Sequence, residues 1–167
     1  MKRSFQSLSP QEALHVAIFI EERNAETYHN FAQLFVSFQD STSLQTAGVL
    51  WEMAEEERHH STLLQERYTA LYGQSACALT GADVQEIIEF PQFVEEGIFD
   101  STDAEAARIR ALRIALGAEN QARDFYVALG KTASDPALRA LYQELSGFEA
   151  EHVEFLERKL ASSTPRG

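Results

Sequence analysis

Cysteine is nearly absent from this chain, which contains only Cys77 among its 167 residues. A single thiol excludes an intrachain disulfide, and it excludes zinc and iron sites that are built from paired CxxC motifs. A chain that does not depend on disulfides fits a reducing compartment, so we expect a cytoplasmic protein.

Long apolar runs and excess basic charge are also missing. The longest apolar run, VAIFI at 16–20, is far shorter than the roughly 20 residues that cross a bilayer. The polar N-terminus MKRSFQSLSPQ lacks the features of a signal peptide. Asp and Glu number 26 against 14 Lys and Arg, and the net charge of −12 repels nucleic acids and anionic membranes while it attracts cations. We therefore expect no nucleic-acid or membrane partner for this chain, and cations as its small ligands.

What the sequence does contain is a set of helix-start and helix-stop signals. Ser9 reads as an N-cap, with Pro10 as the first helical residue and Glu12 as its capping-box partner. Gly73 is a helix stop. The other start signals are a capping box at Thr102 and Glu105 and the Asp135–Pro136 pair. Together with the apolar periodicity between these signals, they predict four long helices, over residues 10–39, 44–72, 102–131 and 136–160.

These helices are each about 40 Å long, because a helix rises roughly 1.5 Å per residue. Short connections join the first helix to the second and the third to the fourth, whereas the long segment 74–101 carries the chain back along the bundle. The pattern predicts an all-α fold, a ferritin-like antiparallel four-helix bundle with a long crossover. We expect a lead at 1–9, one four-helix domain at 10–160 with a short helical turn at 91–99, and a flexible tail at 161–167.

The two halves of the chain repeat. AIFIEERNAETYHNFA at 17–32 aligns without gaps with ALGAENQARDFYVALG at 115–130. The matched pairs are Glu21 with Glu119, Tyr28 with Tyr126, Glu57 with Glu149 and His60 with His152. Such a repeat predicts a bundle with a pseudo-twofold axis.

All five histidines follow a glutamate by three residues, so the Glu-x-x-His spacing alone selects no site. A helix advances about 100° per residue, and this phase shows which pairs share the apolar face. Glu57 and His60 lie on the apolar face of the second helix. Glu149 and His152 do the same in the fourth. The pairs that fall outside, which we interpret as surface or boundary residues, are Glu12/His15, Glu26/His29 and Glu56/His59.

The first and third helices each contribute one inward glutamate. Glu21 lies at the centre of its apolar face and matches Glu119, while the rival Glu22 lies about 100° round the helix. Tyr28 and Tyr126 lie two turns further on, roughly 10 Å along the axis, too far to bind a metal beside the glutamate of their own helix. We interpret them first as core aromatics. In a second interpretation, each hydroxyl donates a hydrogen bond to a ligand carboxylate of a neighbouring helix.

Four inward glutamates and two inward histidines thus gather near the middle of the expected bundle. Buried unpaired carboxylates cost several kcal/mol or take up protons, and four of them repel one another. Two divalent cations would balance the four charges, and carboxylate with imidazole suits iron, manganese or zinc. One glutamate from each of two helices with Glu-x-x-His from each of the other two is the di-metal carboxylate pattern. The expected metal ligands are Glu21, Glu57, His60, Glu119, Glu149 and His152.

The chain resembles the rubrerythrin and erythrin branch of the ferritin-like proteins along nearly its whole length, through the motifs EERNAETYHNFA, EEERHHSTLL, AENQARDFY and FEAEHVEFLE. The resemblance implies two iron ions, Fe(II) or Fe(III), with Glu57 and Glu149 as the bridging carboxylates of the catalytic centre. It implies terminal ligands Glu21 and His60 for one iron, and Glu119 and His152 for the other. The sequence departs from the family at Ala122, where rubrerythrins carry a further ligand glutamate, and its single cysteine excludes a rubredoxin domain.

The resemblance makes a di-iron oxidoreductase the first expectation. Fe(II) would react with peroxide or dioxygen, in peroxide detoxification or in ferroxidase-type iron handling, with electrons from an external donor or from Fe(II) itself. Two alternatives stay open: a di-iron monooxygenase, which needs an apolar substrate channel, and a non-catalytic metal-binding helical module. The family also implies a homodimer.

Overall fold

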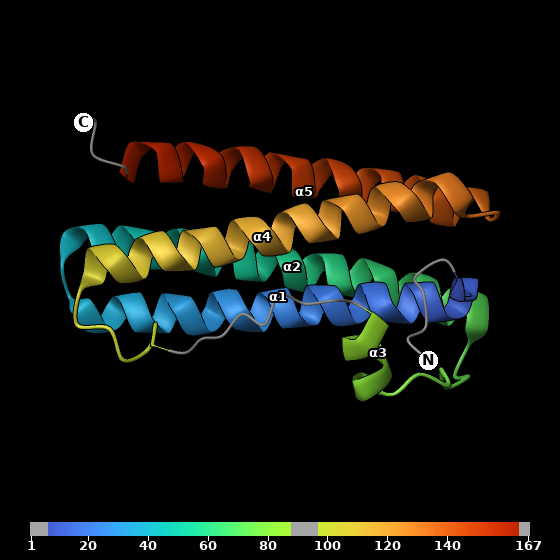
Figure 1. Cartoon of the computed structure of the whole chain (residues 1–167). Helices are drawn as coiled ribbons and strands as arrows, with labels where there is room; N and C mark the ends of the chain where they lie inside the picture. The colour runs from blue at the N-terminus through green and yellow to red at the C-terminus, as the bar shows by residue number, and fades with distance from the viewer. Residues whose placement is uncertain (1–6, 88–96, 164–167) are drawn as a thin grey trace.

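A computed structural model of the protein describes residues 7–87 and 97–163, without the side chains of residues 85–87. The regular elements in these ranges are all helical, four of them long and one short (Figure 1). They are α1 (Pro10–Phe38), α2 (Ser41–Tyr72), α3 (Gly81–Ile87), α4 (Ala104–Thr132) and α5 (Pro136–Ser163). The predicted all-α fold is confirmed.

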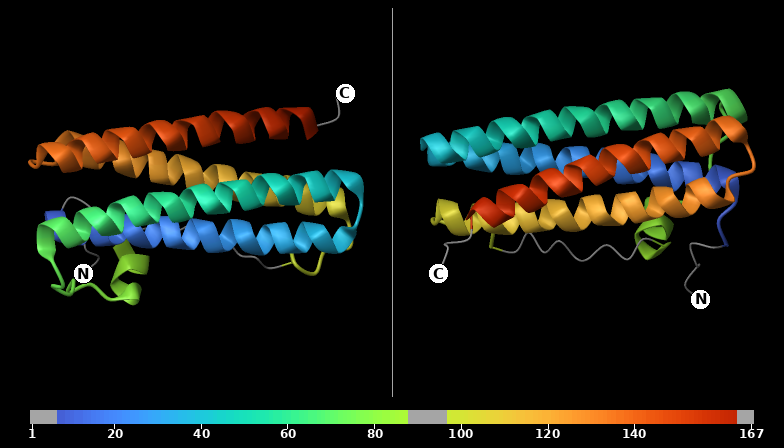
Figure 2. Two further views of the ribbon diagram at one scale, coloured as in Figure 1. Left: turned by 180° about the vertical axis from the view of Figure 1, so that it is seen from behind. Right: turned by 90° about the horizontal axis from the view of Figure 1, so that it is seen from above.

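The four long helices form two antiparallel hairpins. α1 packs along α2 and α4 packs along α5, as all three views show (Figures 1 and 2). The hairpins meet mainly where α1 contacts α4. The chain leaves α2 at one end of the bundle and enters α4 at the other, so the connection between them spans the length of the molecule (Figure 1). This is the predicted crossover.

The first helix begins as the sequence predicts. The Ser9 hydroxyl accepts a hydrogen bond from the backbone N–H of Glu12 at 3.2 Å, and the Glu12 carboxylate accepts one from the N–H of Ser9 at 2.9 Å. This reciprocal capping box satisfies two N–H groups that have no partner inside the helix. α2 ends at Gly73 with φ 61°, a left-handed value that glycine adopts without steric cost.

Two of the long helices extend beyond their predicted boundaries. α2 begins at Ser41, three residues before the predicted start, because Asp40 caps it and accepts a hydrogen bond from the N–H of Ser43 at 2.9 Å. α5 continues to Ser163, so residues 161–163 are helical and do not belong to a flexible tail. At the start of α2 the local sequence offers several candidate caps, and Asp40 is the one that forms.

The predicted capping box of Thr102 and Glu105 is wrong. Asp103 caps α4 instead, because its carboxylate accepts hydrogen bonds from the N–H groups of Glu105 at 3.0 Å and Ala106 at 3.1 Å. The helix therefore begins at Ala104 rather than at 102.

The crossover contains a short helix that the sequence did not predict, α3 at Gly81–Ile87. The helical turn that the sequence suggested lies at 91–99. Most of that range lies outside the described residues, as do residues 1–6 of the lead and 164–167 of the tail.

The core consists of two apolar clusters, one toward each end of the bundle. One cluster includes Leu14, Leu64, Tyr126 and Leu145, and the other includes Phe31, Leu50, Leu112 and Leu156. Along every long helix, a buried glutamate lies between the residues of the two clusters. No helix within the described ranges combines the length and apolar character of a membrane span.

Candidate metal centre

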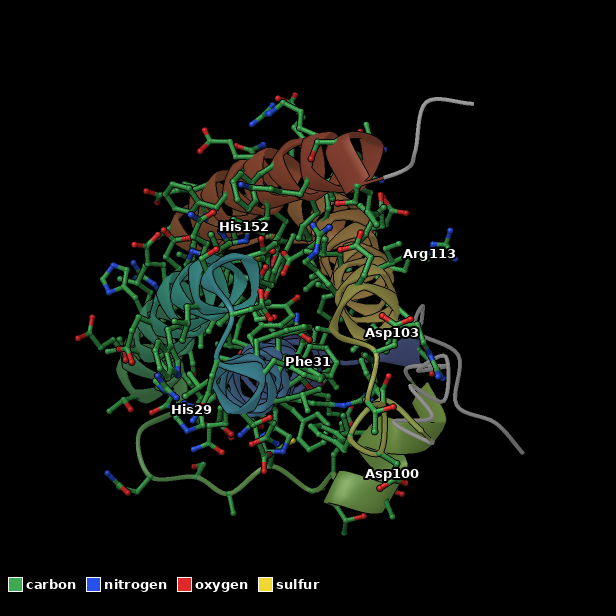
Figure 3. All side chains as sticks on the ribbon, turned by 90° about the vertical axis from the view of Figure 1, so that its left-hand side faces the viewer. His29, Phe31, Asp100, Asp103, Arg113 and His152 are labelled. Atoms are coloured by element: carbon green, nitrogen blue, oxygen red, sulfur yellow. The ribbon has the colours of Figure 1, made fainter. Side chains whose placement is uncertain are left out.

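The polar layer between the two clusters contains all six residues that the sequence analysis selected. They are Glu21 from α1, Glu57 and His60 from α2, Glu119 from α4, and Glu149 and His152 from α5. The four glutamate side chains are fully buried and His60 is 4% exposed. Seen along the bundle, His152 lies between α5 and α2 (Figure 3). The structure thus brings these residues together from four helices.

Their donor atoms form two overlapping groups. One consists of Glu21, Glu57, His60 and Glu149, and the other of Glu57, Glu119, Glu149 and His152. Within each group the donor atoms lie within 4.8 Å of one another, close enough to hold a metal ion. Only Glu57 and Glu149 belong to both groups, so these two carboxylates are common to both possible ion positions.

Both histidines present the same ring atom to the carboxylates. Nδ1 of His60 lies 3.4 Å from an oxygen of Glu21 and 3.4 Å from an oxygen of Glu149. Nδ1 of His152 lies 3.2 Å from Glu119 and 3.3 Å from Glu57. In both rings Nδ1 is therefore the atom available for ligation, and Nε2 is free to bond elsewhere.

Several buried polar atoms in this layer have no hydrogen-bond partner among the described residues. They are both carboxylate oxygens of Glu57 and of Glu149, Oε2 of Glu21 and Nδ1 of His60. A buried polar atom without a partner costs about 1–3 kcal/mol, and folded proteins contain few of them. Their concentration between four helices indicates a site for a cation, which would use their lone pairs.

Without a metal, protons bound to the buried carboxylates lower the negative charge of this layer. Burial, reinforced by the neighbouring carboxylates, raises the pKa of Glu57 and of Glu149 well above the ordinary value. Burial also acts to raise the pKa of Glu119, but Glu149 and His152 outweigh it and lower that pKa. Burial acts to lower the pKa of His60, but the facing carboxylates of Glu149 and Glu21 outweigh it and raise this pKa to about 9.

The metal-free protein is therefore expected to lose stability as pH rises. A group with a raised pKa holds its proton more tightly in the folded state, so its stabilisation disappears as it deprotonates. The contribution of His60 is fully present below 6.5 and is lost as pH rises through about 9. Glu57 and Glu149 also hold their protons more tightly in the folded state, so their contribution to stability is likewise lost as pH rises above their ordinary pKa of 4.5.

Urea unfolding in a chelator, at pH 6.5 and at pH 9, measures this dependence against the window that His60 defines. We expect a lower midpoint at the higher pH for metal-free protein. Metal-loaded protein is the control, because deprotonated ligands bind metal better and the trend should weaken or reverse. A metal-free midpoint that rises with pH would contradict the assignment.

Two tyrosine hydroxyls bond the outer carboxylates crosswise. Tyr28 of α1 donates to Glu119 of α4, and Tyr126 of α4 donates to Glu21 of α1. Both tyrosines are fully buried. These are the bonds that the second interpretation of the tyrosines predicted, and they orient each glutamate from the opposite hairpin.

Replacing Tyr28 with phenylalanine is expected to weaken metal binding. The loss of a partner that orients a ligand typically lowers metal affinity by about 10–100-fold. Tyr142→Phe is the matched control, because the Tyr142 hydroxyl is equally buried but has no hydrogen-bond partner in the described structure. Calorimetric titration with Mn(II) measures both variants. Equal affinities of Tyr28→Phe and Tyr142→Phe would show that the crosswise bond does not support the site.

The structure also shows which of the alternative glutamates and histidines belong to the cluster. Glu22 is exposed and accepts a hydrogen bond from Gln65 at 2.9 Å, so Glu21 is the glutamate of α1 that joins the cluster. His15, His29 and His59 lie outside both groups. Glu56, in contrast, contacts the cluster through an oxygen that lies 2.5 Å from Nε2 of His152. Sequence reasoning missed this contact, because helical phase describes one helix and the partner lies on another.

A groove between α2 and α5 opens above the two histidines. Its volume is about 720 Å³ and its walls include both His60 and His152. Four glutamates line it, namely Glu52, Glu55, Glu56 and Glu151. Solvent cations attracted by this charge would meet the histidine edge of the buried cluster first.

No family model and no curated protein matches this chain. Among solved structures, it is similar to the crystal structure of an uncharacterized conserved protein from Magnetospirillum magnetotacticum, with a TM-score of 0.73 and 25% sequence identity. The match covers 96% of this chain and 98% of the other. The helical fold is common to both. Because that protein is uncharacterized, the likeness assigns no activity.

Proposed function

We propose that the protein is a di-iron oxidoreductase of the rubrerythrin and erythrin type, in which Fe(II) reacts with peroxide or dioxygen. The observation that carries the proposal is the sharing of Glu57 and Glu149 by the two donor groups. Glu57 and Glu149 would hold two ions side by side, and two Fe(II) ions would supply the two electrons that one peroxide takes up. A single-ion site would need no such sharing.

The residues present fit two divalent ions. Four carboxylates and two imidazoles suit iron, manganese or zinc, and the oxygens without partners in Glu57 and Glu149 have lone pairs that both ions would use. Glu21 and His60 would complete one position, and Glu119 and His152 the other. Ala122 is fully buried and offers no donor, so the proposed set stays at six residues.

Bound iron would supply electrons to the oxidant, and the chain supplies the conditions. Glu57 and Glu149 would hold both ions, while Tyr28 and Tyr126 keep the outer carboxylates in place. The apolar clusters on both sides of the layer exclude bulk water. The chain has one cysteine and cannot form a rubredoxin-type iron site, so further electrons come from an external donor or from Fe(II) as substrate.

The groove that reaches the two histidines has a mixed lining. Its four glutamates suit cations, whereas Val49, Met53, Phe148 and Phe155 are apolar walls of the kind that a monooxygenase substrate needs, so the lining alone does not separate the two activities. A more apolar cavity of about 620 Å³ lies at one end of the bundle, lined by residues such as Leu71, Leu138 and Tyr142. None of the six cluster residues lines that cavity.

Anaerobic addition of two equivalents of Fe(II) to metal-free protein, followed by peroxide, tests the proposal. We expect a new absorption band of bound Fe(III) and the oxidation of two Fe(II) for each peroxide, because reduction of peroxide to water takes two electrons. The same reaction with Glu57→Ala is the control. Binding of zinc or iron without oxidation would favour a non-catalytic metal-binding module, and one ion per chain would contradict the di-iron centre.

A further inference from the structure

The two histidines of the cluster occupy equivalent positions in the repeat but have unlike neighbours. Nε2 of His152 lies 2.5 Å from a carboxylate oxygen of Glu56, which comes from α2. The ring of His60 instead stacks on Phe148 of α5, with ring centroids 5.3 Å apart and 11° between the planes. Glu56 and Phe148 are themselves equivalent, since each directly precedes the bridging glutamate of its helix. The repeat therefore places a carboxylate beside one imidazole and a phenyl ring beside the other.

The contact with Glu56 favours the tautomer of His152 that metal ligation requires. Nδ1 of His152 faces the carboxylates of Glu119 and Glu57, so a metal bound there needs Nδ1 without a proton. The proton of the neutral ring then lies on Nε2, and Glu56 accepts it in a hydrogen bond. A carboxylate in this position fixes the tautomer and the ring orientation and makes the ligand more basic.

We infer that Glu56 is a positioning residue that makes the Glu119–His152 position the tighter of the two metal positions. This inference rests on the proposed di-metal centre. Phe148 packs against His60 but accepts no hydrogen bond from a ring nitrogen, and no carboxylate among the described residues contacts Nε2 of His60. The two positions should therefore differ in affinity, by about 10–100-fold, the typical effect of such a partner.

The role belongs to Glu56 and not to the acidic groove as a whole. Glu55 in the same groove pairs with Arg58, three residues along the same helix. Glu52 also lines the groove and is exposed, but it makes no contact with His152. Glu52→Gln therefore removes the same charge from the same groove without touching the ring, which makes it the matched control.

Anaerobic calorimetric titration of metal-free protein with Co(II) tests the inference. We expect two binding steps in the unaltered protein. Glu56→Ala should weaken the tighter step by about 10–100-fold, so that the two steps merge. Glu56→Gln keeps an acceptor oxygen without the charge, so the affinity of its tighter step should fall by less. Glu52→Gln should keep both binding steps. Glu56 is largely exposed, so these variants should fold.

Proton NMR of the Co(II)-loaded protein adds a readout that general destabilisation would not change. The hydrogen bond should protect the exchangeable Nε2 proton of His152 from solvent exchange, and Glu56→Ala should remove this protection while the His60 signal is unaffected. Two ions bound with an unchanged tighter step in Glu56→Ala would overturn the role of Glu56 and leave the proposed function intact. Failure of the unaltered protein to bind a second ion would instead overturn the proposed function itself.

Discussion

Replacing Glu57 with alanine is expected to remove both metal ions from the protein. Glu57 belongs to both donor groups, so its loss takes one carboxylate from each group and leaves Glu149 as the one residue that they share. We expect each affinity to fall by more than the roughly 100-fold that follows the loss of a partner which only orients a ligand. Glu21→Ala should behave differently, because Glu21 belongs to one group and its loss should weaken one position.

Metal analysis after equilibrium dialysis against Fe(II) under anaerobic conditions distinguishes these variants. Glu22→Ala is the control, because Glu22 is one position away on the same helix as Glu21 but is exposed. We expect Glu22→Ala to retain both ions, Glu21→Ala to retain one, and Glu57→Ala to retain neither. Retention of one ion by Glu57→Ala would mean that Glu57 is a terminal ligand and not a bridge.

Replacing Glu57 with leucine is expected to stabilise the metal-free protein. The carboxylate is fully buried, has no hydrogen-bond partner in the described structure and faces other carboxylates. A buried polar group without a partner costs about 1–3 kcal/mol, and an apolar side chain of similar volume in its place removes this cost. The same variant should lose the stabilisation by metal, which is roughly 2.7 kcal/mol at a free metal concentration of 100 times Kd.

Urea unfolding with chelator and with excess Mn(II) measures both effects. Glu57→Leu should be more stable than the unaltered protein in chelator and less stable in Mn(II). Leu64→Ala is the control on the same helix: Leu64 is fully buried in an apolar cluster, so its truncation should cost about 2–5 kcal/mol under both conditions. A Glu57→Leu protein that unfolds earlier in chelator would show that the carboxylate contributes to the fold without metal.

The sequence predicted the bundle because its helical signals are long and mutually consistent. The apolar period runs through about 30 residues per helix, and Ser9 and Glu12 form the capping box that their spacing suggests. The errors concern single ends. Asp40 and Asp103 each stand beside other Ser, Thr or Asp residues that also favour caps, and the local sequence does not decide between them.

The same reasoning selected Glu21 over Glu22 and His60 over His59, because a rotation of about 100° moves a side chain from the core to the surface. It did not identify Glu56 as a neighbour of His152. That contact depends on how far α2 and α5 are rotated and shifted relative to each other, which the periodicity of either helix leaves undetermined. The pairing of each tyrosine hydroxyl with one carboxylate depends on the same relation between α1 and α4.

The division of donors between the hairpins has a consequence for the origin of the chain. The α1–α2 hairpin provides Glu21, Glu57 and His60, and the α4–α5 hairpin provides Glu119, Glu149 and His152. Each donor group takes three residues from one hairpin and a single glutamate from the other. An ancestor of half the length, pairing with a second copy of itself, would already have presented the full set of donors. Gene duplication and fusion would then have joined two working halves, and later divergence, as at Glu56 and Phe148, would have given each half its own character.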